Sequence, residues 1–279
     1  LMGDVNRIAL YYFFAVLLFC FFKPRALAGI CVGLLVGYWA LLSFVPFPDV
    51  RPTPEVTVIA KETGFTNVTQ LNWSSTNLLR GTFDKGVNLA NYVDQKYLPG
   101  RKYDGTWDPE GILSTIPAIA TCLLGVFAGF LLRDRKITDS RKLIFLLAGG
   151  AAAVVLGWWW GFQFPVIKKI WTSSYVLVSG GYSAMLLGLF YLIVDVWQRR
   201  TWCQPFVWIG MNSITLYIAS SLFDEFRRLS VRLAGGDLKN FFDARVTQGF
   251  GDLMIVIVGL LLAFWLAHFL YKRKIFLRL

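Results

Sequence analysis

The feature that most constrains this chain is a series of seven long apolar runs without a single Lys, Arg, Asp or Glu. A helix needs about 20 apolar residues to cross a hydrocarbon core about 30 Å thick, and these runs contain 15 to 22 residues each. The sequence therefore predicts an all-α fold, a polytopic transmembrane helix bundle with about seven spans in the lipid bilayer. The predicted spans are residues 8–22, 26–47, 112–132, 143–162, 173–194, 205–223 and 253–271.

Composition excludes a soluble alternative. Charged residues make up only 16% of the 279 residues, whereas hydrophobic residues make up 56%. Soluble domains carry about 25% charged residues, so this chain has too little polar surface to cover a water-facing globule. An ordinary cytosolic enzyme and a disordered protein are both excluded on these grounds.

The net charge of +11 is explained by membrane topology. One alternating set of flanks holds 13 Lys and Arg in 28 residues, whereas the opposite set holds 15 in 110 residues. The side richer in Lys and Arg faces the cytoplasm, which predicts a cytoplasmic C-terminus. A nucleic-acid partner is not needed to account for the charge.

The chain is predicted to be a single integral-membrane domain, residues 1–279. Two long segments, 48–107 and 224–252, are predicted to lie on the extracytoplasmic side. The sequence starts at Leu1, and no cationic leader with a cleavage site precedes Ile8, so we expect it to be the later part of a larger bundle.

The first candidate site lies at the start of the third span, in residues 107–115. Asp108 is predicted to cap the helix N-terminus, with Pro109 at the first helical position and Glu110 in the first turn. The same carboxylates, together with the Thr115 hydroxyl, could instead hold a polar substrate. The sequence leaves both interpretations open.

The second candidate site is the short extracytoplasmic connector, residues 164–175. Lys168 and Lys169 oppose the charge bias of that side, and a lysine can bind a phosphate or carboxylate as a point charge. The alternative places them at headgroup level, with Trp171 in the aromatic belt. The further candidates for binding donor or acceptor are Ser174 in this connector and Asn212 within the sixth span.

Glycine repeats predict close helix contacts. Gly29, Gly33 and Gly37 recur every four residues, and the pairs Gly125/Gly129 and Gly157/Gly161 repeat the spacing. Small residues let helices approach closely in lipid. Packing within the chain is the favoured interpretation, and a homodimer contact is the alternative. The four cysteines show no metal-binding spacing, so no metal site is predicted.

Several of these motifs occur together in one known family. The pieces run in order along the chain: residues 3–10, residues 88–94, the stretch Tyr-Asp-Gly-Thr-Trp-Asp-Pro-Glu-Gly-Ile-Leu-Ser-Thr-Ile-Pro-Ala at 103–118, residues 164–175, and Gly-Met-Asn-Ser at 210–213. In these pieces the chain resembles the heparan-α-glucosaminide N-acetyltransferase family, especially its bacterial members.

The resemblance implies an integral-membrane acyltransferase, of a bacterial inner membrane, with acetyl-CoA as co-substrate. It implies transfer of the acetyl group to an amino sugar or glycan across the membrane. The family's catalytic histidine is expected upstream of Leu1, so no catalytic residue is assigned within this chain. A carrier or exporter without covalent chemistry, and a structural membrane module, are the alternatives.

Overall fold

The computed structural model describes residues 4–51, 71–100, 102–213, 215–217, 225–234 and 237–275. It divides into two compact units, Leu1–Leu192 and Ile193–Leu279, which are described separately. Parts of the predicted segments 48–107, 205–223 and 224–252 lie outside the described residues.

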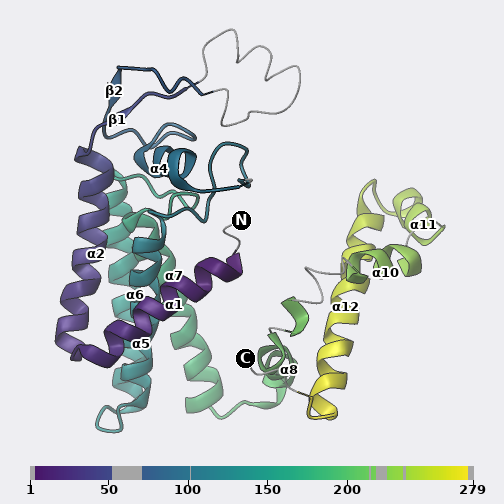
Figure 1. The fold of residues 1–279 in the computed structure, drawn as a ribbon. Helices are drawn as coiled ribbons and strands as arrows, with labels where there is room; N and C mark the ends of the chain where they lie inside the picture. Colours follow the sequence, from purple (N-terminus) through teal and green to yellow (C-terminus); the bar gives the residue numbers. More distant parts are fainter. Residues whose placement is uncertain are drawn as a thin grey trace. The chain divides into compact units, whose positions relative to one another are not determined.

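Five long helices build the first unit (Figure 1). They are α1 (Asp4–Phe21), α2 (Pro24–Phe44), α5 (Thr115–Arg133), α6 (Asp139–Gly161) and α7 (Ser173–Tyr191). Their ends follow from local sequence. Pro24 occupies the first position of α2, where its missing N–H costs nothing, and α5 ends before Asp134 in extended conformation.

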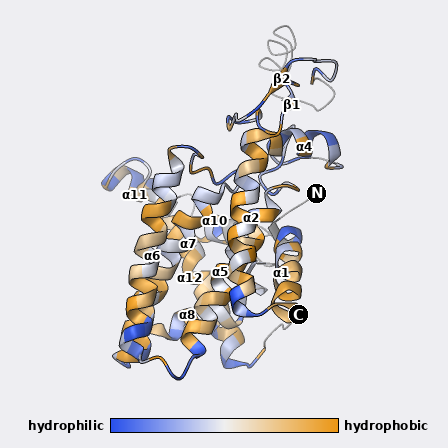
Figure 2. Ribbon diagram, turned by 90° about the vertical axis from the view of Figure 1, so that its left-hand side faces the viewer, coloured by the Kyte–Doolittle hydropathy of each residue, from blue (hydrophilic) through white to orange (hydrophobic). Residues whose placement is uncertain are grey.

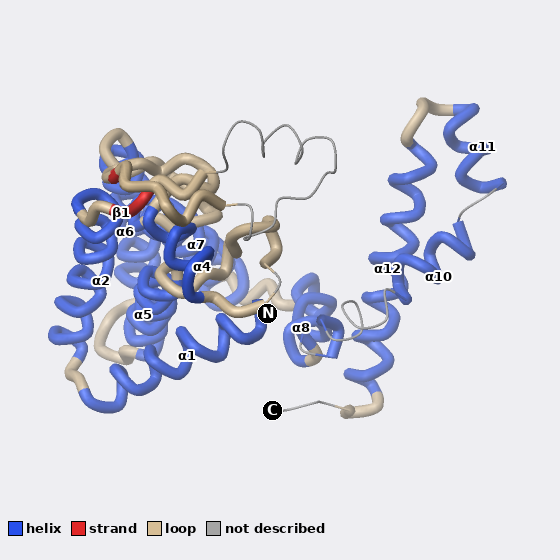
Figure 3. The backbone as a smooth tube through the Cα atoms, turned by 45° about the horizontal axis from the view of Figure 1, so that its top comes forward, coloured by secondary structure: helices blue, strands red, loops and turns tan. Residues whose placement is uncertain are grey.

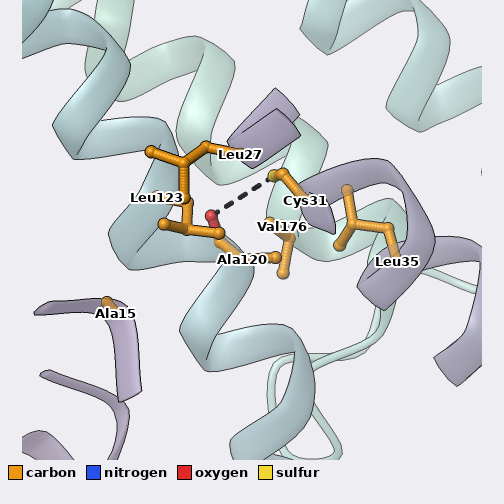
Figure 4. Close-up of a cluster of buried hydrophobic side chains, with 7 residues drawn as sticks. All are labelled: Ala15, Leu27, Cys31, Leu35, Ala120, Leu123 and Val176. Atoms are coloured by element: carbon orange, nitrogen blue, oxygen red, sulfur yellow. Dashed lines mark hydrogen bonds between the residues drawn. The ribbon is translucent and has the colours of Figure 1, made fainter. Parts of the chain in front are cut away.

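The centre of this unit is a small apolar core. Figure 4 shows side chains of α1, α2, α5 and α7 gathered there. They are Ala15, Leu27, Cys31, Leu35, Ala120, Leu123 and Val176. The Cys31 thiol donates a hydrogen bond to the Ala120 carbonyl over 3.7 Å, so the one polar group in the core is satisfied.

Glycines bring α6 and α7 into close contact. A Cβ added at Gly181 would lie 2.5 Å from the Gly150 carbonyl oxygen, and one added at Gly157 would lie 2.7 Å from Val178 Cγ2. A Cβ at Gly161 would approach Val166 to 3.2 Å. The predicted packing within the chain is therefore present at Gly157 and Gly161.

The other two glycine repeats differ from that expectation. Among the described residues, nothing lies within 4 Å of a Cβ built at any of their positions, which are Gly29, Gly33, Gly37, Gly125 and Gly129. Packing within the chain therefore stays a prediction for them, and the buried stripe of α2 runs along Leu27, Cys31 and Leu35 instead.

A loop-rich layer covers the end of the bundle where α2 finishes (Figure 3). It contains the antiparallel pair β1 (Phe47–Pro48) and β2 (Leu78–Leu79) and the short helix α4 (Leu89–Tyr97). Asn88 caps α4 by accepting a hydrogen bond from the Asn91 N–H over 2.9 Å. We call this side of the first unit the α4 end.

Buried hydrogen bonds fix this layer to the bundle. The Tyr38 hydroxyl on α2 donates to the Ile170 carbonyl over 2.6 Å, and the Ser173 hydroxyl donates to the Leu35 carbonyl over 2.7 Å. Both bonds tie the connector between α6 and α7 to α2. The α4 end is therefore a rigid platform on which side chains can be placed accurately.

The second unit is built around one long helix, α12 (Phe250–Lys272). Three shorter helices pack against it: α8 (Gln204–Met211), α10 (Glu225–Ala234) and α11 (Asp237–Arg245). Asp243 on α11 accepts hydrogen bonds from the N–H groups of Gly249 and Gly251 and so closes the turn into α12. The Trp208 and His268 rings lie 4.3 Å apart where α8 contacts α12.

Five described helices are long and apolar enough to cross a membrane. They are Pro24–Phe44, Thr115–Arg133, Asp139–Gly161, Ser173–Val196 and Phe250–Lys272. Figure 2 shows hydrophobic residues along α2 and α6 and hydrophilic residues at the lower end of α6. The all-α fold and five predicted spans are confirmed.

The count of about seven spans is not confirmed. In the first predicted span the apolar helix Asn6–Phe21 is shorter than the other five. In the sixth, α8 ends at Met211 and Asn212 has a φ of −125°, but residues 213 and 215–217 are helical again. Residues 214 and 218–223 of this predicted span lie outside the described residues.

Candidate functional site

The candidate site lies at the α4 end of the first unit, where α5 begins. Residues 102–114, which we call the entrance segment, form a series of turns before the helix starts at Thr115. The prediction that Asp108 caps α5 is therefore wrong, as are the helical positions predicted for Pro109 and Glu110. Asp108 instead accepts hydrogen bonds from the N–H groups of Glu110 and Tyr103, over 3.0 and 3.3 Å.

Those bonds explain why the helix starts late. The Asp108 carboxylate is buried and satisfied inside the turn, so it is not available to the first turn of a helix. The hydroxyls of Ser114 and Thr115 both donate to the Gly111 carbonyl, over 3.0 and 3.1 Å. The turn conformation is thus held by side-chain contacts that compete with helix formation.

Arg7 of α1 also contacts the backbone of the entrance segment. Its guanidinium donates to the carbonyls of Pro109 and Ser114, over 3.4 and 3.0 Å, and lies 4.3 Å from the centre of the Trp171 ring. Only 4% of Arg7 is exposed. A buried guanidinium with carbonyl and aromatic partners joins three distant parts of the chain.

The two connector lysines lie in different surroundings. Lys169 forms an ion pair with Asp104 and lies 5.2 Å above the Trp107 ring, so it joins the connector to the entrance segment. Lys168 is exposed. Trp171 adopts a left-handed φ of 52° and donates from Nε1 to the Thr121 hydroxyl over 3.1 Å.

The remaining predicted site residues do not all lie beside the entrance segment. Ser174 is fully buried and donates to the Phe164 carbonyl over 2.6 Å, which holds the connector in place. Asn212 belongs to the second unit, where its amide donates to the Trp208 carbonyl of its own helix over 3.3 Å. The structure therefore brings together Asp108, Glu110, Thr115, Lys169 and Trp171.

Sequence reasoning missed a buried polar face on α4. Asn91, Asp94 and Gln95 follow one another at helical spacing, and each is at least 96% buried. Asn91 Oδ1 accepts from the Gly86 N–H over 3.0 Å, and Gln95 Nε2 donates to the Gly86 carbonyl over 3.4 Å. Within the described chain, Asn91 Nδ2 and Gln95 Oε1 find no hydrogen-bond partner.

Asp94 is the group on this face with the most perturbed chemistry. Burial raises its pKa to about 7, and the neighbouring Asp108 also raises it, whereas Lys102 and the N–H groups of Ile112 and Asp108 lower it. A carboxyl that changes charge near neutral pH in a buried cluster is typical of a functional site. The signal in the sequence for this face is the helical spacing of these three polar residues after Asn88, which caps α4.

Comparison with known proteins identifies the relatives of this chain. Heparan-alpha-glucosaminide N-acetyltransferase of Homo sapiens is 32% identical over 178 residues. The protein of the same name from Mus musculus is 30% identical over 180 residues. The predicted resemblance is confirmed.

These alignments include 61% of this chain and 25% of each acetyltransferase. The chain thus spans about a quarter of the length of the curated relatives it matches. No protein-family profile matches the chain.

Proposed function

We propose that the chain forms part of an integral-membrane acyltransferase, which moves an acetyl group from acetyl-CoA to an amino sugar or glycan across the membrane. The observation that carries this proposal is the 30–32% identity to two N-acetyltransferases. The buried polar cluster at the α4 end supports it, because a polar acceptor needs such groups at the edge of an apolar bundle. We also propose a bacterial inner membrane, with the C-terminus in the cytoplasm.

The proposed chemistry is attack of the acceptor's neutral amine on the thioester carbonyl. The new carbon–nitrogen bond replaces the carbon–sulfur bond, the CoA thiol leaves, and the amine proton passes to a base. We propose that this base is a histidine of the full-length protein, as the resemblance implies. The residues described here would therefore bind and orient the acceptor.

The site residues divide by what surrounds them. Glu110 and Lys168 would contact the acceptor's amine and its anionic groups, and the half-buried Trp171 ring would contact the sugar face. Asp108, Thr115 and Ser174 would shape the site, since their oxygens bond to nearby backbone. Lys169 would hold the connector against the entrance segment through its ion pair with Asp104. Asn212, in the second unit, is a separate proposal for an orienting amide.

Transfer of radiolabelled acetyl from acetyl-CoA to glucosamine tests the proposal, with membranes that contain the full-length natural protein. We expect Glu110→Gln to lower kcat/KM by about 10-fold or more, because a charged hydrogen bond to the amine is worth roughly 1.5–3 kcal/mol. The control is Asp134→Asn at the exposed far end of α5, which leaves transfer unchanged.

Folded protein that transfers no acetyl group to glucosamine or to larger glycans would contradict the proposal. Accumulation of unmodified glucosamine in proteoliposomes would instead support the carrier alternative. The homodimer is a separate proposal, supported by the open glycine positions of α2 and α5.

A further inference from the structure

Asp94 holds the backbone of the entrance segment. Its Oδ1 accepts a hydrogen bond from the Ile112 N–H over 2.9 Å, and the Asp108 N–H also bonds to this carboxyl. The side chain is 2% exposed. One carboxyl on α4 therefore accepts from the backbone of a segment that has no regular secondary structure to satisfy its N–H groups.

Gly111 makes this contact possible. A Cβ at position 111 would lie 1.9 Å from Asp94 Oδ2 and 2.4 Å from Cγ. Those distances are far inside van der Waals contact, so only glycine lets the carboxyl approach this closely. Asp94 thus fits sterically against Gly111 and accepts a hydrogen bond from the next residue, Ile112.

The entrance segment is held from two sides by groups of opposite charge. Asp94 accepts from its N–H groups, whereas Arg7 donates to its carbonyls at Pro109 and Ser114. The Arg7 bonds are charge-assisted and so about twice as strong as usual, and the Asp94 bonds become so where its carboxyl is ionised. Asp94 and Arg7 each contact the segment on both sides of Glu110 in the sequence.

Two titratable groups of the entrance segment, Asp108 and Lys102, act electrostatically on the Asp94 carboxyl. Asp108 disfavours the charged carboxylate and Lys102 favours it, so the charge on Asp94 depends on the segment that it holds.

We propose that Asp94 is a positioning residue whose carboxyl fixes the entrance segment against α4 and thereby places Glu110 for the acceptor. This inference rests on the proposed function for the acceptor, although the contact itself does not. Asp94 acts through the backbone of the segment and touches no reacting atom. Its loss therefore affects acceptor binding more than the chemical step.

The first measurement is amide hydrogen exchange of residues 104–114 at fixed pH, in the full-length protein in nanodiscs. We expect Asp94→Ala to speed exchange in this segment by about 10-fold or more, because both N–H groups lose their acceptor. Asp94→Asn keeps an acceptor oxygen and stays within about 3-fold of the wild type. Gly111→Ala should resemble Asp94→Ala, and Gly149→Ala on α6, where the added methyl group meets nothing among the described residues, is its control.

The second measurement is steady-state transfer to glucosamine. We expect Asp94→Ala to raise KM by about 10-fold with kcat changed by less than about 3-fold, and Asp94→Asn to restore most of the loss at pH 7. Unchanged exchange in both Asp94→Ala and Gly111→Ala would overturn the inference, as would unchanged KM with an active wild type. If the wild type transfers no acetyl group but exchange responds as expected, the proposed function fails and the positioning role stands.

Discussion

The side chain of Asp94 occupies the space that any Cβ at position 111 would need, and this contact joins two segments far apart in the sequence. The sequence shows the local signals, namely the Asn88 cap and the polar spacing on α4. It does not show the contact, because no periodic pattern relates residues 94 and 111. The roles chosen for Lys169 and Trp171 from charge and position stay predictions; the structure places Lys169 over the Trp107 ring and Arg7 over the Trp171 ring.

The raised pKa of Asp94 predicts that thermal stability falls as the pH rises. Between pH 3.8 and about 7 the native carboxyl keeps a proton that the unfolded chain has lost. The native state thus binds more protons, so the free energy of unfolding decreases with increasing pH, by at most about 4 kcal/mol from this group. The measurement is Tm in detergent from pH 4.5 to 8.

Asp94→Asn is the matched control, because its amide cannot ionise. We expect its Tm to change less over this range than that of the wild type, and the difference between the two curves isolates Asp94 from other titrating groups. Parallel curves for the wild type and Asp94→Asn would show that Asp94 does not titrate in the native protein.

Helix boundaries were more predictable than contacts between helices. The spans of α2, α5, α6, α7 and α12 follow from apolar length alone, because the hydrocarbon core demands about 20 such residues. The start of α5 was misplaced, since the hydrogen bonds that Asp108 accepts and Arg7 donates hold the preceding residues in turns. Glycine spacing indicated close packing but could not say which repeats are used: Gly157 packs against α7, whereas Gly33 meets nothing among the described residues.

This difference predicts opposite effects of adding one methyl group. Gly181→Ala would place a Cβ 2.5 Å from the Gly150 carbonyl oxygen, so we expect it to separate α6 from α7 and destabilise the protein by about 1–3 kcal/mol. Gly149→Ala meets no described neighbour and should be neutral or slightly stabilising. Thermal unfolding in one detergent compares the two variants, and equal Tm values would contradict the packing described for α6 and α7.

At the scale of the whole molecule, the polar residues of the first unit are distributed unequally between its ends. The α4 end holds a buried network of charged and amide side chains, including Arg7, Asp94 and Asp108. At the opposite end, Lys142 donates to the Leu132 carbonyl and closes the turn between α5 and α6. This asymmetry fits the proposal that the acceptor binds on the extracytoplasmic side while the charged flanks face the cytoplasm.

The most direct test of this account is vectorial transfer in sealed vesicles of known orientation that contain the full-length protein. Radiolabelled acetyl-CoA is supplied only on the cytoplasmic side, and glucosamine only on the opposite side. The account predicts labelled N-acetylglucosamine in the compartment that held the glucosamine, with the yield lowered by Glu110→Gln. Labelled product formed only when both substrates share the cytoplasmic side would contradict it.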